Sequence, residues 1–110
     1  MTAELVMAIP MLVALTAGLV WLLSVAFAQV RMIDAARETA RALARGDDQA
    51  SALALGHRVA PAGAHFTITE SDGLVRVRAT CPVGGPGTGL ALVPGVELSA
   101  QAVALLEDEP

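Results

Sequence analysis

A long uncharged run near the N-terminus limits the folds open to this chain of 110 residues. From Leu5 to Val30 there is no charged side chain. About 20 apolar residues in a helix are enough to cross the hydrocarbon core of a bilayer. The polar interruptions, such as Thr16 and Ser24, are mild because a hydroxyl group can bond back to the helix backbone. Residues 1–30 are therefore predicted to form a transmembrane segment.

The same run resembles a secretory signal peptide only in part. A signal peptide has a basic start, an apolar stretch of about 7–15 residues and a small-residue cleavage site. The first residues instead contain an acid, Glu4, and no Arg or Lys, and the apolar stretch is longer. Val25 to Ala28 is similar to a cleavage site, so removal stays the alternative to a retained helix.

Five residues of this helix are candidates for packing between subunits: Glu4, Leu5, Pro10, Gly18 and Trp21. Gly18 leaves a small surface that allows close helix contact, and Pro10 predicts a slight kink in the second turn. Glu4 has two interpretations that the span alone does not separate. It can complement the positive end of its own helix dipole, or it can neutralise the N-terminal amine of a neighbouring subunit.

The helical pattern continues beyond the apolar run, over residues 31–45. Apolar side chains recur there at spacings of three and four, and these positions are Met32, Ile33, Ala36, Ala40, Leu43 and Ala44. Arg37, Arg41 and Arg45 fall on another face, which we interpret as a solvated one. Gly46 is the expected C-terminal cap. This amphipathic extension needs a cover, which the C-terminal part of the chain must supply.

Residues 46–110 are predicted to form a small head. A short helix begins after Asp47 or Asp48 and ends at Gly56. A hairpin over residues 65–80 follows, because alternating apolar residues flank Asp72-Gly73 and Pro82 ends the second strand. Residues 95–107 alternate as a third strand would, although their Ala content leaves a helix from Ser99 as the alternative. The predicted fold class is α+β.

Composition and motifs give no support to an enzyme. The net charge is −4 and there is no lysine, which argues against a nucleic-acid partner. The lone Cys81 is interpreted as a buried apolar residue, with an intermolecular disulfide as the alternative. His57, an expected loop residue, and His65, an expected strand start, have no acid pair beside them. The glycine-rich stretch 84–89 lacks the Lys of a phosphate loop. We predict no catalytic residues, no cofactor and no metal site.

The layout of the chain resembles type IV pilin-like proteins. An acid precedes a long apolar segment, the segment continues as an amphipathic helix, and a small β-rich head follows. The stretches Thr2 to Pro10 and Val30 to Arg37 are more narrowly similar to the TadE-like minor pilins of tight-adherence (Flp) systems, in particular the actinobacterial type. The resemblance covers most of residues 2–45 and, loosely, the hairpin.

The resemblance implies that the chain matures by proteolytic processing. Such proteins carry a short basic leader ending in Gly, which a prepilin peptidase removes at the cytoplasmic face. Their acid lies at the fifth mature position and corresponds to Glu4 here. Met1 stands where the mature chain has already begun, and a start codon placed too far downstream would explain this. N-terminal sequencing of the native protein tests that hypothesis.

The resemblance also implies an orientation and partners. The arginines after the span would favour a cytoplasmic location by the positive-inside rule, whereas the family has this part outside, and we follow the family. The expected partners are the membrane, other pilin subunits and the inner-membrane assembly platform. The expected function is that of a minor pilin or pseudopilin in a pilus or a related type II/IV secretion machine. The alternatives are a single-pass accessory subunit of a larger membrane complex and a secreted binding domain with a cleaved anchor.

Overall fold

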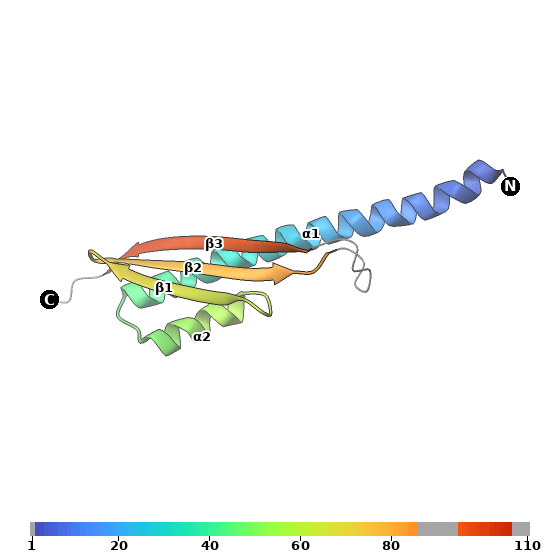
Figure 1. Cartoon of the computed structure of the whole chain (residues 1–110). Helices are drawn as coiled ribbons and strands as arrows, with labels where there is room; N and C mark the ends of the chain where they lie inside the picture. Colours follow the sequence, from blue (N-terminus) through green and yellow to red (C-terminus); the bar gives the residue numbers. More distant parts are fainter. Residues whose placement is uncertain (1, 86–94, 107–110) are drawn as a thin grey trace.

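The computed structural model describes residues 2–85 and 95–106 and shows an elongated molecule of 78 × 21 × 20 Å (Figure 1). The described elements are α1 (Ala3–Ala44), α2 (Gln49–Val59), β1 (His65–Ser71), β2 (Leu74–Val83) and β3 (Val96–Leu105). The strands form one antiparallel sheet in the order β1-β2-β3. The predicted α+β class, with a long first helix, a short second one and a sheet of three strands, is confirmed.

Helix α1 has clear signals at both ends. Thr2 is its N-cap, and the Thr2 hydroxyl accepts a hydrogen bond from the backbone N–H of Leu5. At the other end Gly46 has a φ of 100°, and its N–H bonds to the carbonyl of Leu43. The N–H of Asp47 reaches the carbonyl of Ala42, which completes a Schellman motif. Gly46 therefore ends the helix as predicted.

The second half of α1 supplies the centre of the core. Of the predicted apolar stripe, Ile33 is half-buried and the other members are buried. Ala35, Thr39 and Ala42 are also buried, which the stripe did not include. The buried face is wider than predicted because α1 packs on two sides, against the sheet through β2 and β3 and against the helix α2. Its many alanines let both neighbours approach closely.

Helix α2 begins as predicted and ends later than predicted. Asp48 is its N-cap, and the Asp48 carboxylate accepts a hydrogen bond from the N–H of Ser51. The prediction that Gly56 stops the helix is wrong, since α2 continues to Val59. Gly56 is buried and sits against Thr39 of α1 and the ring of Phe66. It is thus a close-packing position inside the helix, and His57, predicted in a loop, lies in α2 as well.

The sheet follows the alternation of the sequence. Asp72 and Gly73 both have positive φ, 53° and 76°, which is the backbone of a type I′ turn and confirms the hairpin. The predicted end of the second strand at Pro82 is one residue short, because β2 runs to Val83. Pro82 lies past the last residue that pairs with β1, so only β3 adjoins it. The third segment is a strand, as favoured over a helix.

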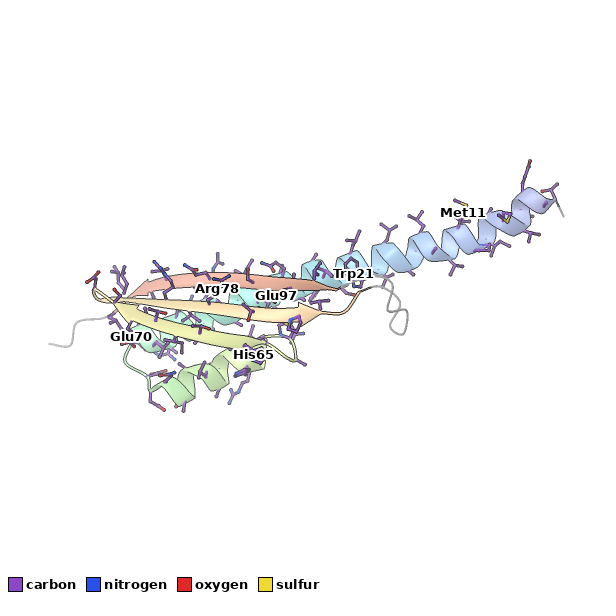
Figure 2. All side chains as sticks on the ribbon, viewed as in Figure 1. Met11, Trp21, His65, Glu70, Arg78 and Glu97 are labelled. Carbon is purple, nitrogen blue, oxygen red and sulfur yellow. The ribbon has the colours of Figure 1, made fainter. Side chains whose placement is uncertain are left out.

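One face of the sheet is covered and the other is open. The covered face carries a fully buried row on β2, formed by Val75, Val77, Ala79 and Cys81. Arg76 and Arg78 alternate with this row and are exposed on the opposite face, where Figure 2 labels Arg78. The core is therefore a single layer between the sheet and the helix pair. It occupies only the C-terminal part of α1, and the N-terminal part of that helix extends away from it (Figure 1).

Candidate assembly helix and its junction with the head

The first 18 residues of α1, Ala3 to Val20, stand free of the head (Figure 2). Apart from Ala8 and Gly18, which are half-buried, every side chain in this stretch is exposed. Most are large and apolar, for example Met11, which is 71% exposed. The helix is long and apolar enough to cross a membrane, and none of its most apolar window is buried in the molecule. Such a surface needs lipid or other protein around it.

The residues predicted to pack between subunits lie along this helix without converging. Glu4 lies in the first turn and is exposed, and Leu5 beside it is 51% exposed. Pro10 lies inside the helix, which continues through it. A Cβ added at Gly18 would meet nothing within 4 Å, so this position is open to a neighbour. At 1.5 Å per residue, Glu4 and Trp21 are about 26 Å apart along the axis.

Trp21 marks where the head begins to contact α1. Its indole Nε1 donates a hydrogen bond of 2.7 Å to the carbonyl oxygen of Gly84, just after β2. This is the first bond between α1 and the sheet side of the molecule, counted from the N-terminus of the described chain. Trp21 is half-buried as a result. The structure therefore gives Trp21 a role within its own chain, beside the packing role that the sequence suggested.

Two further polar residues attach the head to α1, and the sequence reasoning missed both. The side-chain amide of Gln29 donates to the backbone carbonyl of Ser99 in β3 at 3.0 Å. The guanidinium of Arg31 donates to the last carbonyls of α2, from Nε to Val59 at 3.0 Å and from Nη2 to Ala60 at 3.2 Å. A cation at a helix C-terminus is also favoured by the helix dipole. The signal that could have identified these two residues was their position, because both are polar side chains at the end of the apolar run.

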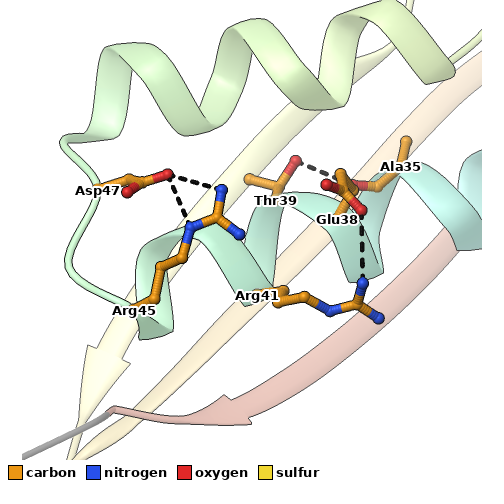
Figure 3. Close-up of polar contacts among 6 residues, drawn as sticks. All are labelled: Ala35, Glu38, Thr39, Arg41, Arg45 and Asp47. Carbon is orange, nitrogen blue, oxygen red and sulfur yellow. Dashed lines mark hydrogen bonds and ion pairs between the residues drawn. The ribbon is translucent and has the colours of Figure 1, made fainter.

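Beyond the junction, α1 carries charges on its solvent side. Glu38 and Arg41 lie one turn apart with their charged atoms 3.8 Å apart, and Arg45 holds Asp47 through two hydrogen bonds (Figure 3). These pairs are exposed, so each contributes less than about 1 kcal/mol. Arg37, Arg41 and Arg45 also border an open hollow of about 450 Å³ between α1 and β3. The solvated arginine face is as predicted.

The histidines and the cysteine of the head were the side chains that the sequence left to be placed. No group of three or more His, Cys, Asp or Glu residues that could bind a metal occurs among the described residues. The ring of His57 stands edge-on to Phe66 with centroids 4.8 Å apart, and His65 starts β1. Cys81 is buried, with its Sγ 3.6 Å from the carbonyl oxygens of Ala62 and Pro82. Part of the glycine-rich stretch 84–89 lies outside the described residues.

A comparison with known protein families finds a match over most of helix α1. Residues 1–41 match the family model of the TadE-like proteins. The match covers the free part of α1, the junction at Trp21 and most of the buried half of the helix, and stops before the head. No curated protein and no solved structure shows a significant match to the chain. The TadE-like resemblance drawn from the sequence is thus confirmed, while its actinobacterial type stays a prediction.

Proposed function

We propose that this chain, TadE-like in its N-terminal helix, is a structural minor pilin or pseudopilin of a tight-adherence (Flp) pilus or a related secretion machine. The TadE-like family is associated with the Tad pilus, and its role there is structural and not enzymatic. The observation that carries the proposal is the free half of α1, an apolar helix of 18 residues with no partner inside the described chain. In this function it anchors the subunit in the membrane and later packs against other pilin helices.

Glu4 gives the proposal its most specific feature. At a solvated helix N-terminus a carboxylate gains only about 0.3–1 kcal/mol from the helix dipole. Inside a bundle of apolar helices the same charge is costly unless a cation pairs with it. The N-terminal amine of a neighbouring subunit is a cation that lies near the start of such a helix. Glu4 would then set the register between subunits, whereas insertion into the membrane needs only the residues after it.

The test separates assembly from insertion. Glu4→Ala is expected to abolish incorporation into the fibre, measured in sheared surface fractions, while the chain stays in the membrane fraction. Glu38→Ala is the matched control, because this acid lies on the same helix but pairs with Arg41 beside the head. The control should assemble normally. Normal assembly of the Glu4 variant would contradict the proposal.

The orientation and partners follow from the same proposal. The head would lie outside the cytoplasm, and the chain would meet other pilin subunits and the membrane platform of the pilus. A prepilin peptidase would act on a leader upstream of the mature start. The alternative function, an accessory subunit of a larger membrane complex, shares the anchor. Neighbouring genes for a secretion ATPase and two polytopic platform proteins would favour the pilin.

A further inference from the structure

The end of the head nearest the free helix cannot enter hydrocarbon. Gln29 bonds the carbonyl of Ser99, and Trp21 bonds the carbonyl of Gly84, so β3 and the end of β2 run beside residues 21–29 of α1. Glu97 lies two residues before Ser99, about 7 Å nearer the free helix. That places its exposed carboxylate at the level of about residue 24 or 25 of α1. Figure 2 shows Glu97 and Trp21 at this same end of the head.

The open edge of β3 is a second polar feature at this end, beside the carboxylate of Glu97. β3 pairs only with β2 among the described strands, so the N–H and C=O groups of its outer edge have no strand partner. In the hydrocarbon core each unsatisfied backbone group costs several kcal/mol, and open sheet edges do not occur there. A charged side chain adds a further penalty of about 3 kcal/mol or more. The head therefore has to stay at or above the lipid surface.

The sequence alone favours a deeper placement. Taken as a uniform apolar run, Leu5 to Val30 would be centred in the bilayer, with Trp21 about 5 Å from the midplane. Glu97 and the edge of β3 would then lie within the hydrocarbon, whose half-thickness is about 15 Å. Centring the free stretch Ala3 to Val20 instead keeps the head out of the hydrocarbon, because this stretch is about 27 Å long and puts Trp21 about 14 Å from the midplane. Glu4, in the first turn on the opposite side, then lies about 4 Å inside the lipid boundary, where its side chain can reach the headgroups, and no sheet edge enters with it.

We propose that the head rests directly on the phospholipid bilayer, with Trp21 and Gly84 at the lipid–water boundary and only residues 3–20 of α1 in the hydrocarbon. An indole at this depth matches the preference of Trp for membrane interfaces. The free helix then crosses nearly upright, because it has little length to spare for tilt. Apolar residues beyond Trp21, such as Leu22 and Leu23, lie at the headgroup level. This placement depends on α1 crossing a membrane and not on the pilus function.

Trp21 itself is the probe for the test, because the chain has one Trp and no Tyr. The full chain is reconstituted into phosphatidylcholine vesicles that contain lipids brominated either near the glycerol end or near the methyl end of the acyl chain. Trp21 fluorescence is expected to be quenched at least twofold more by the shallow bromines than by the deep ones. Equal or stronger quenching by the deep bromines would overturn the proposal.

Two variants calibrate the depth scale. Both carry Trp21→Phe, and one adds Leu12→Trp whereas the other adds Phe27→Trp. Position 12 lies near the midplane of the proposed span and should be quenched most by deep bromines. Position 27 lies about 9 Å beyond Trp21 along the axis and should be quenched by aqueous acrylamide but little by either lipid. Strong quenching of position 27 by either brominated lipid would show that the head sinks into the membrane and would overturn the placement.

Discussion

The contact between Gly56 of α2 and Thr39 of α1 should be among the least tolerant positions in the head. A Cβ at position 56 would lie well inside contact distance of the Thr39 hydroxyl oxygen and 3.1 Å from Cζ of Phe66. Neither neighbour can move freely. Thr39 is fully buried, and its hydroxyl donates a hydrogen bond of 2.9 Å to the carbonyl of Ala35 (Figure 3). The Phe66 ring packs against His57. Gly56→Ala should therefore force α2 away from α1.

The expected change in the free energy of unfolding combines one stabilising contribution with two destabilising ones. Alanine in a helix interior is about 0.8–1 kcal/mol more favourable than glycine, which would stabilise the variant. Overpacking a filled site costs about 1–3 kcal/mol. Disturbing the hydroxyl bond of Thr39 adds about 0.5–1.5 kcal/mol, the usual net value of a neutral hydrogen bond. The balance is a loss of about 2 kcal/mol in the free energy of unfolding.

Chemical denaturation of the full chain in detergent micelles, followed by far-ultraviolet circular dichroism, measures this loss. Gly18→Ala is the matched control, because a Cβ there meets nothing within 4 Å. It should cost nothing measurable. Thr39→Ala removes the obstructing oxygen, so Gly56→Ala should be close to neutral in that background, which gives a large coupling in the double-mutant cycle. A Gly56→Ala chain as stable as the wild type would refute the tight crossing of α1 and α2.

Two further predictions concern the ends of α2. Arg31→Met keeps an unbranched apolar side chain but loses both hydrogen bonds to the carbonyls of Val59 and Ala60. The free energy of unfolding should therefore fall by about 1–2 kcal/mol. Arg58→Met, at an exposed position of α2, is the control and should change the free energy of unfolding little. Hydrogen bonds from the Ser51 side chain and backbone hold the pKa of Asp48 below its ordinary value of 3.8, so the folded state gains stability above that pH and loses it as the pH falls through the folded pKa. As the pH is lowered through this acidic range, the midpoint temperature of unfolding should fall more steeply for the wild type than for Asp48→Asn. If the two proteins lose the same number of degrees over this range, the Asp48 cap does not contribute to the pH dependence of stability.

The parts of the fold that rest on local signals could be predicted from the sequence. Asp72-Gly73 between alternating strands specifies a type I′ hairpin, because both residues accept a positive φ. The stripe that begins at Met32 and the glycine at position 46 define the buried face of α1 and its end. These patterns depend on neighbours within a few residues. The prediction of the strand at Val96–Leu105 succeeded for the same reason, since its alternation outweighed its Ala content.

The features that escaped prediction depend on contacts between distant parts of the chain. Gly56 looks like a helix stop until Thr39 of another helix is placed against it. The bonds of Trp21 to Gly84 and of Gln29 to Ser99 join residues 63 and 70 positions apart. Nothing local distinguishes a Trp or a Gln that binds the head from one that faces lipid. The sequence could therefore identify an apolar helix and its candidate residues, but not the point where the head meets it.

That point divides the apolar run into two stretches with different surroundings. If lipid alone required the apolar side chains, the run would have no reason to continue past Trp21, because the head already lies beside the helix there. It nevertheless continues to Val30. The side of α1 that faces the sheet includes Val25 and Ala28, which are half-buried, whereas Leu23 and Phe27 are each 67% exposed. Residues 3–20 satisfy the needs of a membrane anchor. On the proposed function, the exposed apolar side chains beyond the headgroup level, such as Phe27 and Val30, are the ones that only a neighbouring subunit would cover. Anchor and assembly surface therefore follow one another along a single helix.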